Sequence, residues 1–150
     1  MKRRYWDLEP AVAAIDSADL TTRMQCFVDA MWPHLHAAGV SWLGFYLRDG
    51  DNRLVLGPRR DKPACSPIGL HGACGRAVLT RRPLVVHDVA ELGDEYIACD
   101  VNDRSEVVIP IFDEKGLCRG VLDLDSHAVG AFDEHDVECL TRLLRLAGLT

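Results

Sequence analysis

The chain has 150 residues, of which 48% are hydrophobic and 27% are charged, and its formal net charge at pH 7 is -6. This length and composition predict one globular domain that covers residues 1–150. The acidic balance argues against a nucleic-acid partner, and no apolar run approaches the roughly 20 residues that a membrane span needs. Because Asp7 and Glu9 stand where a signal peptide would be apolar, we expect a cytoplasmic protein.

Two helices are expected near the N-terminus, over residues 10–15 and 20–38. Apolar side chains recur at helical spacing in the second helix and give it one apolar face: Met24, Phe27, Val28, Met31 and Leu35. Pro33 is expected to kink this helix or to divide it, because proline removes a helical hydrogen bond.

A β-hairpin is expected next, with strands over residues 41–47 and 53–56 joined by a turn over 48–52. Side chains alternate between the two faces of a strand. One face of the first strand therefore carries apolar core residues: Leu43, Phe45 and Leu47. The other face presents two amphipathic aromatics separated by a glycine: Trp42, Gly44 and Tyr46.

The middle of the chain is irregular. Residues 57–72 and 88–104 are interpreted as long loops, separated by a short helix over 73–80 and a short strand over 83–87. Loops of this length are unusual in a compact domain and are where functional residues concentrate.

The last third of the chain has the strongest pattern. Strands are expected over residues 106–112 and 117–125, joined by a turn over 113–116. An amphipathic helix over 132–146, with Asp133 near its start, closes the chain. Helix, hairpin, loops, hairpin and helix in this order predict an α+β fold with an antiparallel sheet.

Three carboxyl groups of these late strands are candidates for acid chemistry. Asp123 and Asp125 share one face, while Leu122 and Leu124 point to the core. Aspartate is disfavoured on exposed strands, which favours a pocket over the alternative of a solvent-facing sheet surface. Glu106 could join the aspartates across the hairpin. Clustering and burial raise carboxyl pKa values, so one of the three could stay protonated near neutral pH and act as a general acid.

The six cysteines are more typical of redox or catalytic chemistry than of a structural disulfide framework, since we expect a reducing compartment. Cys26 and Cys139 fall in helical patterns and are expected to be buried, whereas Cys118 is expected to be partly exposed. The other three lie in or beside the irregular segments: Cys65, Cys74 and Cys99.

Three interpretations of these last three cysteines stay open. They could be redox-active, they could be incidental loop thiols, or they could bind zinc with His71 or His87 as a fourth ligand. The zinc interpretation is the weakest from sequence, because no C-x2-C pair is present.

Eight short motifs occur in order along the chain: W-L-G-F-Y-L (42–47), L-V-L-G-P (54–58), K-P-A-C (62–65), G-A-C-G (72–75), D-V (88–89), I-A-C-D (97–100), S-E-V-V-I-P-I (105–111) and G-V-L-D-L-D-S (120–126). Together they resemble the free methionine-(R)-sulfoxide reductases, which are enzymes built on a single GAF domain. The resemblance covers most of the chain, from about Leu20 to the final helix.

The resemblance implies a GAF-like fold, with a central antiparallel sheet of about six strands flanked by helices. It implies that Cys99 is the nucleophile, that Cys65 resolves it through a Cys65–Cys99 disulfide, and that Cys74 is auxiliary. It further implies a substrate pocket lined by two aromatics and three catalytic acids: Trp42, Tyr46, Glu106, Asp123 and Asp125.

The implied reaction is the reduction of free L-methionine-(R)-sulfoxide to methionine, through a cysteine sulfenic acid and a disulfide that thioredoxin reduces. The resemblance also implies a homodimer, with no metal and no other cofactor. The alternative is a non-catalytic GAF module that binds a small ligand or senses redox state through Cys65 and Cys99.

Overall fold

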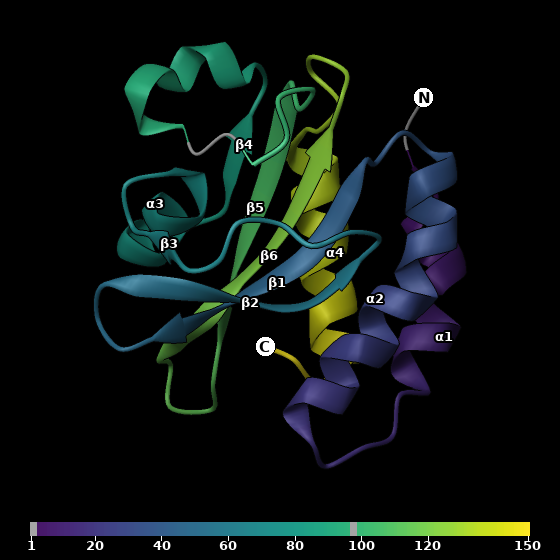
Figure 1. The fold of residues 1–150 in the computed structure, drawn as a ribbon. Helices are drawn as coiled ribbons and strands as arrows, with labels where there is room; N and C mark the ends of the chain where they lie inside the picture. The colour runs from purple at the N-terminus through teal and green to yellow at the C-terminus, as the bar shows by residue number, and fades with distance from the viewer. Residues whose placement is uncertain (1–2, 97–98) are drawn as a thin grey trace.

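The computed structural model describes residues 3–96 and 99–150. Over these residues the chain forms a six-stranded sheet of order β3-β2-β1-β6-β5-β4, in which every neighbouring pair is antiparallel. The strands are β1 (Trp42–Asp49), β2 (Arg53–Arg60), β3 (Ile68–Gly69), β4 (Leu84–Val86), β5 (Ser105–Phe112) and β6 (Cys118–Ser126). Figure 1 shows helices packed on both sides of this sheet, which confirms the α+β prediction.

Helices before, between and after the strands complete the fold. They are the 3-10 helices η1 (Tyr5–Leu8) and η2 (Val89–Glu95), and the α-helices α1 (Glu9–Ala13), α2 (Leu20–Ala37), α3 (Ala73–Thr80) and α4 (Glu134–Leu146). Helix α1 is shorter than predicted and is preceded by η1. None of the described helices is both long and apolar enough to cross a lipid bilayer.

Helix α2 runs unbroken through Pro33, so this proline does not divide the helix, and of the two predicted outcomes only a kink stays a prediction. The missing N–H costs one hydrogen bond, whereas the apolar face of the helix is buried on both sides of the proline, at Phe27, Met31 and Leu35. Cys26 is exposed, not buried as predicted. Its side chain lies on the side of the helix opposite to the buried face that carries Met24 and Phe27.

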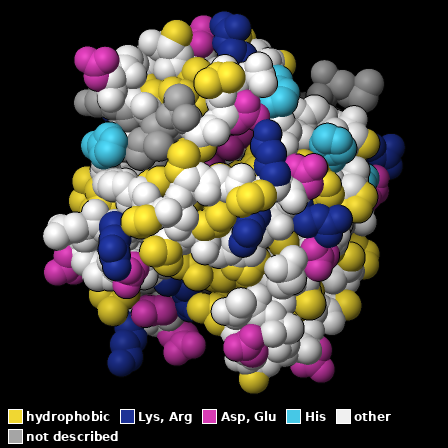
Figure 2. Space-filling view, viewed as in Figure 1, with side chains coloured by type: hydrophobic (Ala, Val, Ile, Leu, Met, Phe, Trp, Pro, Cys, Tyr) yellow, Lys and Arg dark blue, Asp and Glu magenta, His cyan; other side chains and the backbone are white. Residues whose placement is uncertain are grey.

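The two faces of the sheet are covered differently. Helices α1, α2 and α4 cover one face, where Leu43 and Phe45 of β1 and Leu122 and Leu124 of β6 enter the largest apolar core. Helix α3 and the long connections cover the other face, which receives the alternate side chains of the same strands. Figure 2 shows acidic and basic side chains interspersed on the surface seen in this view.

Strand β2 is longer than the sequence predicts and includes residues 57–60, which were expected to form a loop. Arg60 pairs with Leu43, and the register shifts opposite Phe45, where Gly57 and Pro58 lie. Proline is tolerated at such bulges and at sheet edges. A Gly-Pro pair therefore marks an irregularity within this strand and not its end.

Helix α4 begins where the sequence predicts. Asp133 accepts hydrogen bonds from the backbone N–H groups of His135 and Asp136, and Asp136 completes a capping box. Arg3 and Tyr5 both bind the buried carboxylate of Asp136. These contacts connect the N-terminal segment to helix α4.

Candidate active site

A small cavity, partly open to solvent, lies between the second face of the sheet and the segments that cover it. Its walls combine aromatic side chains from β1, carboxyl groups from β5 and β6, the Cys74 thiol from the start of α3 and the sulfur of Cys99 from the segment before β5. Every residue that the sequence singled out contributes to this cavity or, in the case of Cys65, is joined to a residue that does: Trp42, Tyr46, Cys65, Cys74, Cys99, Glu106, Asp123 and Asp125.

The carboxyl groups meet because of the pairing of β5 with β6. Glu106 lies opposite Asp125, and Asp123 lies two pairs further along the strands, on the same face. The exposed fractions are 6% for Glu106, 9% for Asp125 and 4% for Asp123. Glu106 shares hydrogen bonds with both aspartates, so protons must lie between these acceptors.

Burial is the main reason why the pKa of each of these three carboxyl groups is raised. For Asp123 and Asp125 the negative charge of the neighbouring carboxylates raises the pKa further, whereas hydrogen bonds partly lower the pKa of Glu106. The cluster therefore retains protons at pH values at which isolated carboxyl groups are ionised.

Cys74 is placed against this cluster by the start of α3. An added Cβ at Gly75 would lie 2.2 Å from the backbone of Leu70, so glycine is required for the close approach of helix and loop. Cys74 is a buried free thiol. Burial, and next the charge of Asp123, raise its pKa, which makes it a thiol and not a thiolate at neutral pH.

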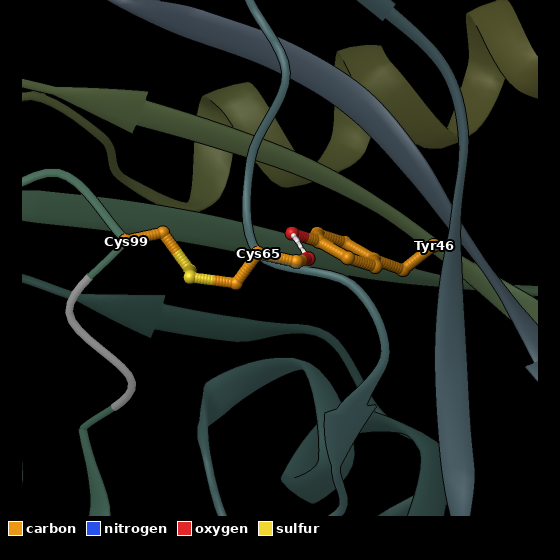
Figure 3. The surroundings of a disulfide bond; sticks show 3 residues. All are labelled: Tyr46, Cys65 and Cys99. Atoms are coloured by element: carbon orange, nitrogen blue, oxygen red, sulfur yellow. Dashed lines mark hydrogen bonds between the residues drawn. A yellow bond between two sulfur atoms is a disulfide. The ribbon is translucent and has the colours of Figure 1, made fainter.

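Cys65 and Cys99 are joined by a disulfide whose Cα atoms are 5.6 Å apart, within the usual range for such a bond. Both residues are exposed, and Cys99 also lines the cavity. The Tyr46 hydroxyl donates a hydrogen bond to the Cys65 carbonyl oxygen at 2.8 Å (Figure 3). The disulfide therefore joins two covering segments over the cavity.

The aromatic side chains of β1 hold the segment that carries Cys65. Besides the Tyr46 contact, Trp42 Nε1 donates a hydrogen bond to the Lys62 carbonyl oxygen at 2.8 Å. Gly44 leaves room for the indole, since an added Cβ there would lie 2.3 Å from Trp42 Cη2. The glycine gap between the two aromatics is therefore a steric requirement of this arrangement.

Charged groups join the same two covering segments at the surface. Lys62 Nζ lies 3.0 Å from Asp100 Oδ2, and His127 Nε2 lies 3.2 Å from the same oxygen. The backbone N–H of Asn102 and then the Lys62 ammonium hold the pKa of Asp100 down at about 2. Burial, and then the charge of Asp100, raise the pKa of Asp103 to about 6.

Comparisons with known proteins agree with this fold. A family model of the GAF domain matches residues 17–150. A free methionine-R-sulfoxide reductase from Neisseria meningitidis, solved in complex with its substrate, is 33% identical, with a TM-score of 0.86 over 95% of this chain and 85% of that one. The reduced form of the Staphylococcus aureus enzyme is 34% identical, with a TM-score of 0.87 over 97% and 94% of the two chains.

The chain belongs to the free methionine-R-sulfoxide reductase family. A curated member from Saccharomyces cerevisiae is 38% identical over 113 residues, which are 73% of this chain and 62% of that protein. The match thus spans less than two thirds of the yeast relative, whereas it spans most of the two solved structures.

Two cavity-lining residues with polar side chains were missed from sequence: Tyr96 and Asp103. Tyr96 precedes the I-A-C-D motif directly, and that adjacency was the available signal. Ile97 and Ala98 of the motif lie outside the described residues. Cys118 was predicted to be partly exposed but is buried, and its thiol donates to the Gly120 carbonyl oxygen at 3.3 Å.

The structure does not bring together the residues of the alternative zinc site with a histidine ligand. Among the described residues, neither His71 nor His87 joins any cysteine in a cluster of possible metal ligands. Cys65 and Cys99 are bonded to one another, and Cys74 faces the carboxyl groups.

Proposed function

We propose that this chain reduces free L-methionine-(R)-sulfoxide to L-methionine. The observation that carries the proposal is the Cys65–Cys99 disulfide beside a cavity that contains three buried carboxyl groups. A sulfoxide reductase needs a sulfur nucleophile, a second thiol and a proton donor, and the cavity brings these three kinds of group together. The likeness to reductases solved in reduced and substrate-bound forms supports the same activity.

In the first step the Cys99 thiolate attacks the substrate, and the sulfoxide oxygen is transferred to the Cys99 sulfur. A protonated carboxyl group among Glu106, Asp123 and Asp125 supplies the proton that the sulfoxide oxygen needs. The products are free methionine and a Cys99 sulfenic acid. The raised carboxyl pKa values support a neutral acid in this role.

In the second step the Cys65 thiol condenses with the sulfenic acid to form the disulfide and release one water molecule. A thioredoxin dithiol then reduces the disulfide by thiol exchange, which supplies the two electrons of the cycle. Cys65 and Cys99 are exposed, as attack by a protein thiol requires. Cys74 is not needed in this sequence of steps.

Negative charge near Cys99 disfavours its thiolate, so a nearby positive charge has to compensate. Lys62 lines a small opening together with Cys99, and its ammonium group pairs with the neighbouring Asp100. We assign to Lys62 part of this compensation and to the substrate's own ammonium group the rest.

Preference for a free amino acid follows from the same charges. An ionised carboxylate within the cluster attracts the α-ammonium group of free methionine sulfoxide, whereas a residue within a peptide chain has no such group. Trp42 and Tyr46 provide the apolar wall for the substrate's thioether arm. The proposal also takes residues 1–150 as one GAF domain, active as a cytoplasmic homodimer.

The decisive measurement is NADPH consumption in the presence of thioredoxin and thioredoxin reductase. Free L-methionine-(R)-sulfoxide, its S epimer and an N-blocked, peptide-like analogue are compared. We expect turnover with the free R form alone. Absence of turnover with folded, reduced protein would contradict the proposal and favour the redox-sensing GAF module, for which an oxidant alone should form the Cys65–Cys99 disulfide.

A further inference from the structure

The proposed cycle leaves Cys74 without a role, although its thiol is buried among acids. One ligand atom from each of Cys74, Glu106 and Asp123 lies within 4.8 Å of the others. The three residues are 5%, 6% and 4% exposed. Such a combination of a thiol and two carboxyl groups is costly to bury unless something binds there.

A second observation at the same place points to a ligand. Asp123 Oδ1 is fully buried and has no hydrogen-bond partner among the described residues. A buried acceptor without a partner costs about 1 to 3 kcal/mol, more when it is charged. This oxygen belongs to a residue that lines the same cavity as Cys74 and Glu106.

We propose that Cys74, Glu106 and Asp123 form a binding site for Zn²⁺ or a similar divalent transition-metal ion, which inhibits the protein by occupying its substrate cavity. One sulfur and two carboxylate oxygens suit Zn²⁺, which accepts both ligand types in a tetrahedral arrangement. Mg²⁺ and Ca²⁺ prefer oxygen ligands alone and are disfavoured by the thiol. A water molecule or the substrate takes the fourth position.

The ion is an exchangeable inhibitor and not a cofactor. When it binds, the Cys74 thiol proton and any protons held by the two carboxyl groups pass to solvent, so the dication replaces the protons that the cluster retains. Because Asp123 and Glu106 also face the substrate in the proposed function, ion and substrate compete for the cavity.

A second group of possible ligands consists of Asp100, Asp103 and His127. This group does not combine buried ligands with an oxygen that has no hydrogen-bond partner. Asp100 already binds Lys62, and Asp103 already accepts a hydrogen bond from the Ser41 hydroxyl at 3.2 Å. Neither has a buried oxygen without a partner. The Cys74 cluster is therefore the one that the geometry favours.

The test is a titration of the full chain with Co²⁺, a spectroscopic substitute for Zn²⁺. The protein used is the Cys65→Ser/Cys99→Ser double variant, which removes the pair of neighbouring cysteines that could bind metal together. We expect one equivalent of Co²⁺ to produce a thiolate-to-cobalt charge-transfer band, and Zn²⁺ to abolish it. This readout does not depend on reductase activity, so the two proposals can fail separately.

Adding Cys74→Ser to the double variant should abolish the band. Adding Cys118→Ser instead is the matched control and should leave it unchanged, because Cys118 is equally buried but bonds to a backbone carbonyl. Asp123→Asn, which keeps the side-chain volume, should weaken binding at least about tenfold. This variant keeps the test valid if Cys74→Ser does not fold.

In the unmodified protein, Zn²⁺ should raise the apparent KM for sulfoxide while leaving kcat unchanged. No band in the double variant, or a band that survives Cys74→Ser, would overturn the proposal. Zinc inhibition without a Cys74-dependent band would place the ion on Cys65 and Cys99 and would overturn it as well.

Discussion

The two faces of the central sheet are made by the same strands and yet have opposite chemistry. On the face covered by α2 and α4, strand residues such as Phe45 and Leu124 are fully buried in an apolar core. On the other face, the side chains next to them in sequence include Tyr46 and Asp125, which line the cavity. Alternation along a strand thus separates a stabilising surface from a reactive one by a single residue.

This contrast concerns folding stability, because the two faces of the sheet contribute to it with opposite sign. Three buried acids destabilise a sheet surface, and the apolar core on its other side compensates. Substitutions on the two faces should therefore have separable effects, one on activity and the other on folding.

The largest effect is expected at the nucleophile. Cys99→Ser should reduce turnover of free methionine sulfoxide at least about a thousandfold, while the free energy of unfolding of the reduced protein changes by less than about 0.5 kcal/mol, because the side chain is exposed. Steady-state NADPH consumption and urea unfolding measure the two quantities. Cys26→Ser, at another exposed cysteine, is the control. Normal turnover of Cys99→Ser would move the nucleophile elsewhere.

Two neighbouring residues of β6 compare the faces directly. Asp125→Asn should lower kcat by roughly 10² to 10⁴-fold without loss of folding stability, since an amide costs less to bury than a carboxylate. A loss of only a few fold would assign the proton donor to Glu106 or Asp123.

Leu124→Ala should do the reverse. Leu124 is fully buried among the residues of the helix-covered core, and its truncation should lower the free energy of unfolding by about 2 to 5 kcal/mol. Turnover per folded molecule should stay within a few fold of the unsubstituted chain. Urea titration and kinetics on the same preparation check both statements, and equal losses in both quantities would contradict the separation of the faces.

Tyr46→Phe should give a smaller and more selective effect. The substitution removes the hydrogen bond that holds the Cys65 carbonyl, worth about 1 kcal/mol, or about fivefold in rate. We expect slower disulfide formation after the first turnover, with nearly unchanged release of the first methionine. Single-turnover quenching with a sulfenic-acid trap separates these steps. A change confined to methionine release would show that Tyr46 acts on the substrate alone.

The smallest effect is expected in the pH dependence of stability. Burial raises the pKa of Asp103 from 3.8 to about 6, so the folded protein binds more protons than the unfolded chain between these values. The free energy of unfolding should therefore fall as pH rises from about 4 to about 6. Asp103→Asn should reduce the total fall over this pH interval by an amount on the order of 1 kcal/mol, measured by urea titration at several pH values. An unchanged pH dependence in Asp103→Asn would contradict the assignment of this effect to Asp103.

Most of the sheet could be predicted because alternation and helical spacing follow directly from side-chain polarity. The faces of β1 and β6, the hairpin that brings Glu106 to the two aspartates, and the Asp133 cap all depend on local pattern. The end of β2 could not be predicted, since Gly57 and Pro58 usually end a strand and here occupy a bulge. A bulge depends on the partner strand, which local sequence does not describe.

The site was predicted more from resemblance than from physics. Strand alternation placed Asp123 and Asp125 on one face, but nothing local paired Cys65 with Cys99 across the intervening segment. Tyr96 was missed because an aromatic in an irregular segment has no periodic partner to reveal its direction. Its position in the cavity follows from the path of the covering segments, which only the three-dimensional structure provides.

The bond between Cys65 and Cys99 closes a ring across a sequence separation of 34 residues. That ring contains the two edge strands of the sheet, β3 and β4, together with α3 and η2. Loop-closure entropy makes a cross-link of this span worth about 4 kcal/mol against unfolding. The oxidised protein should therefore have a higher melting temperature and a greater resistance to proteases than the reduced protein. A change of redox state is thereby also a change of folding stability.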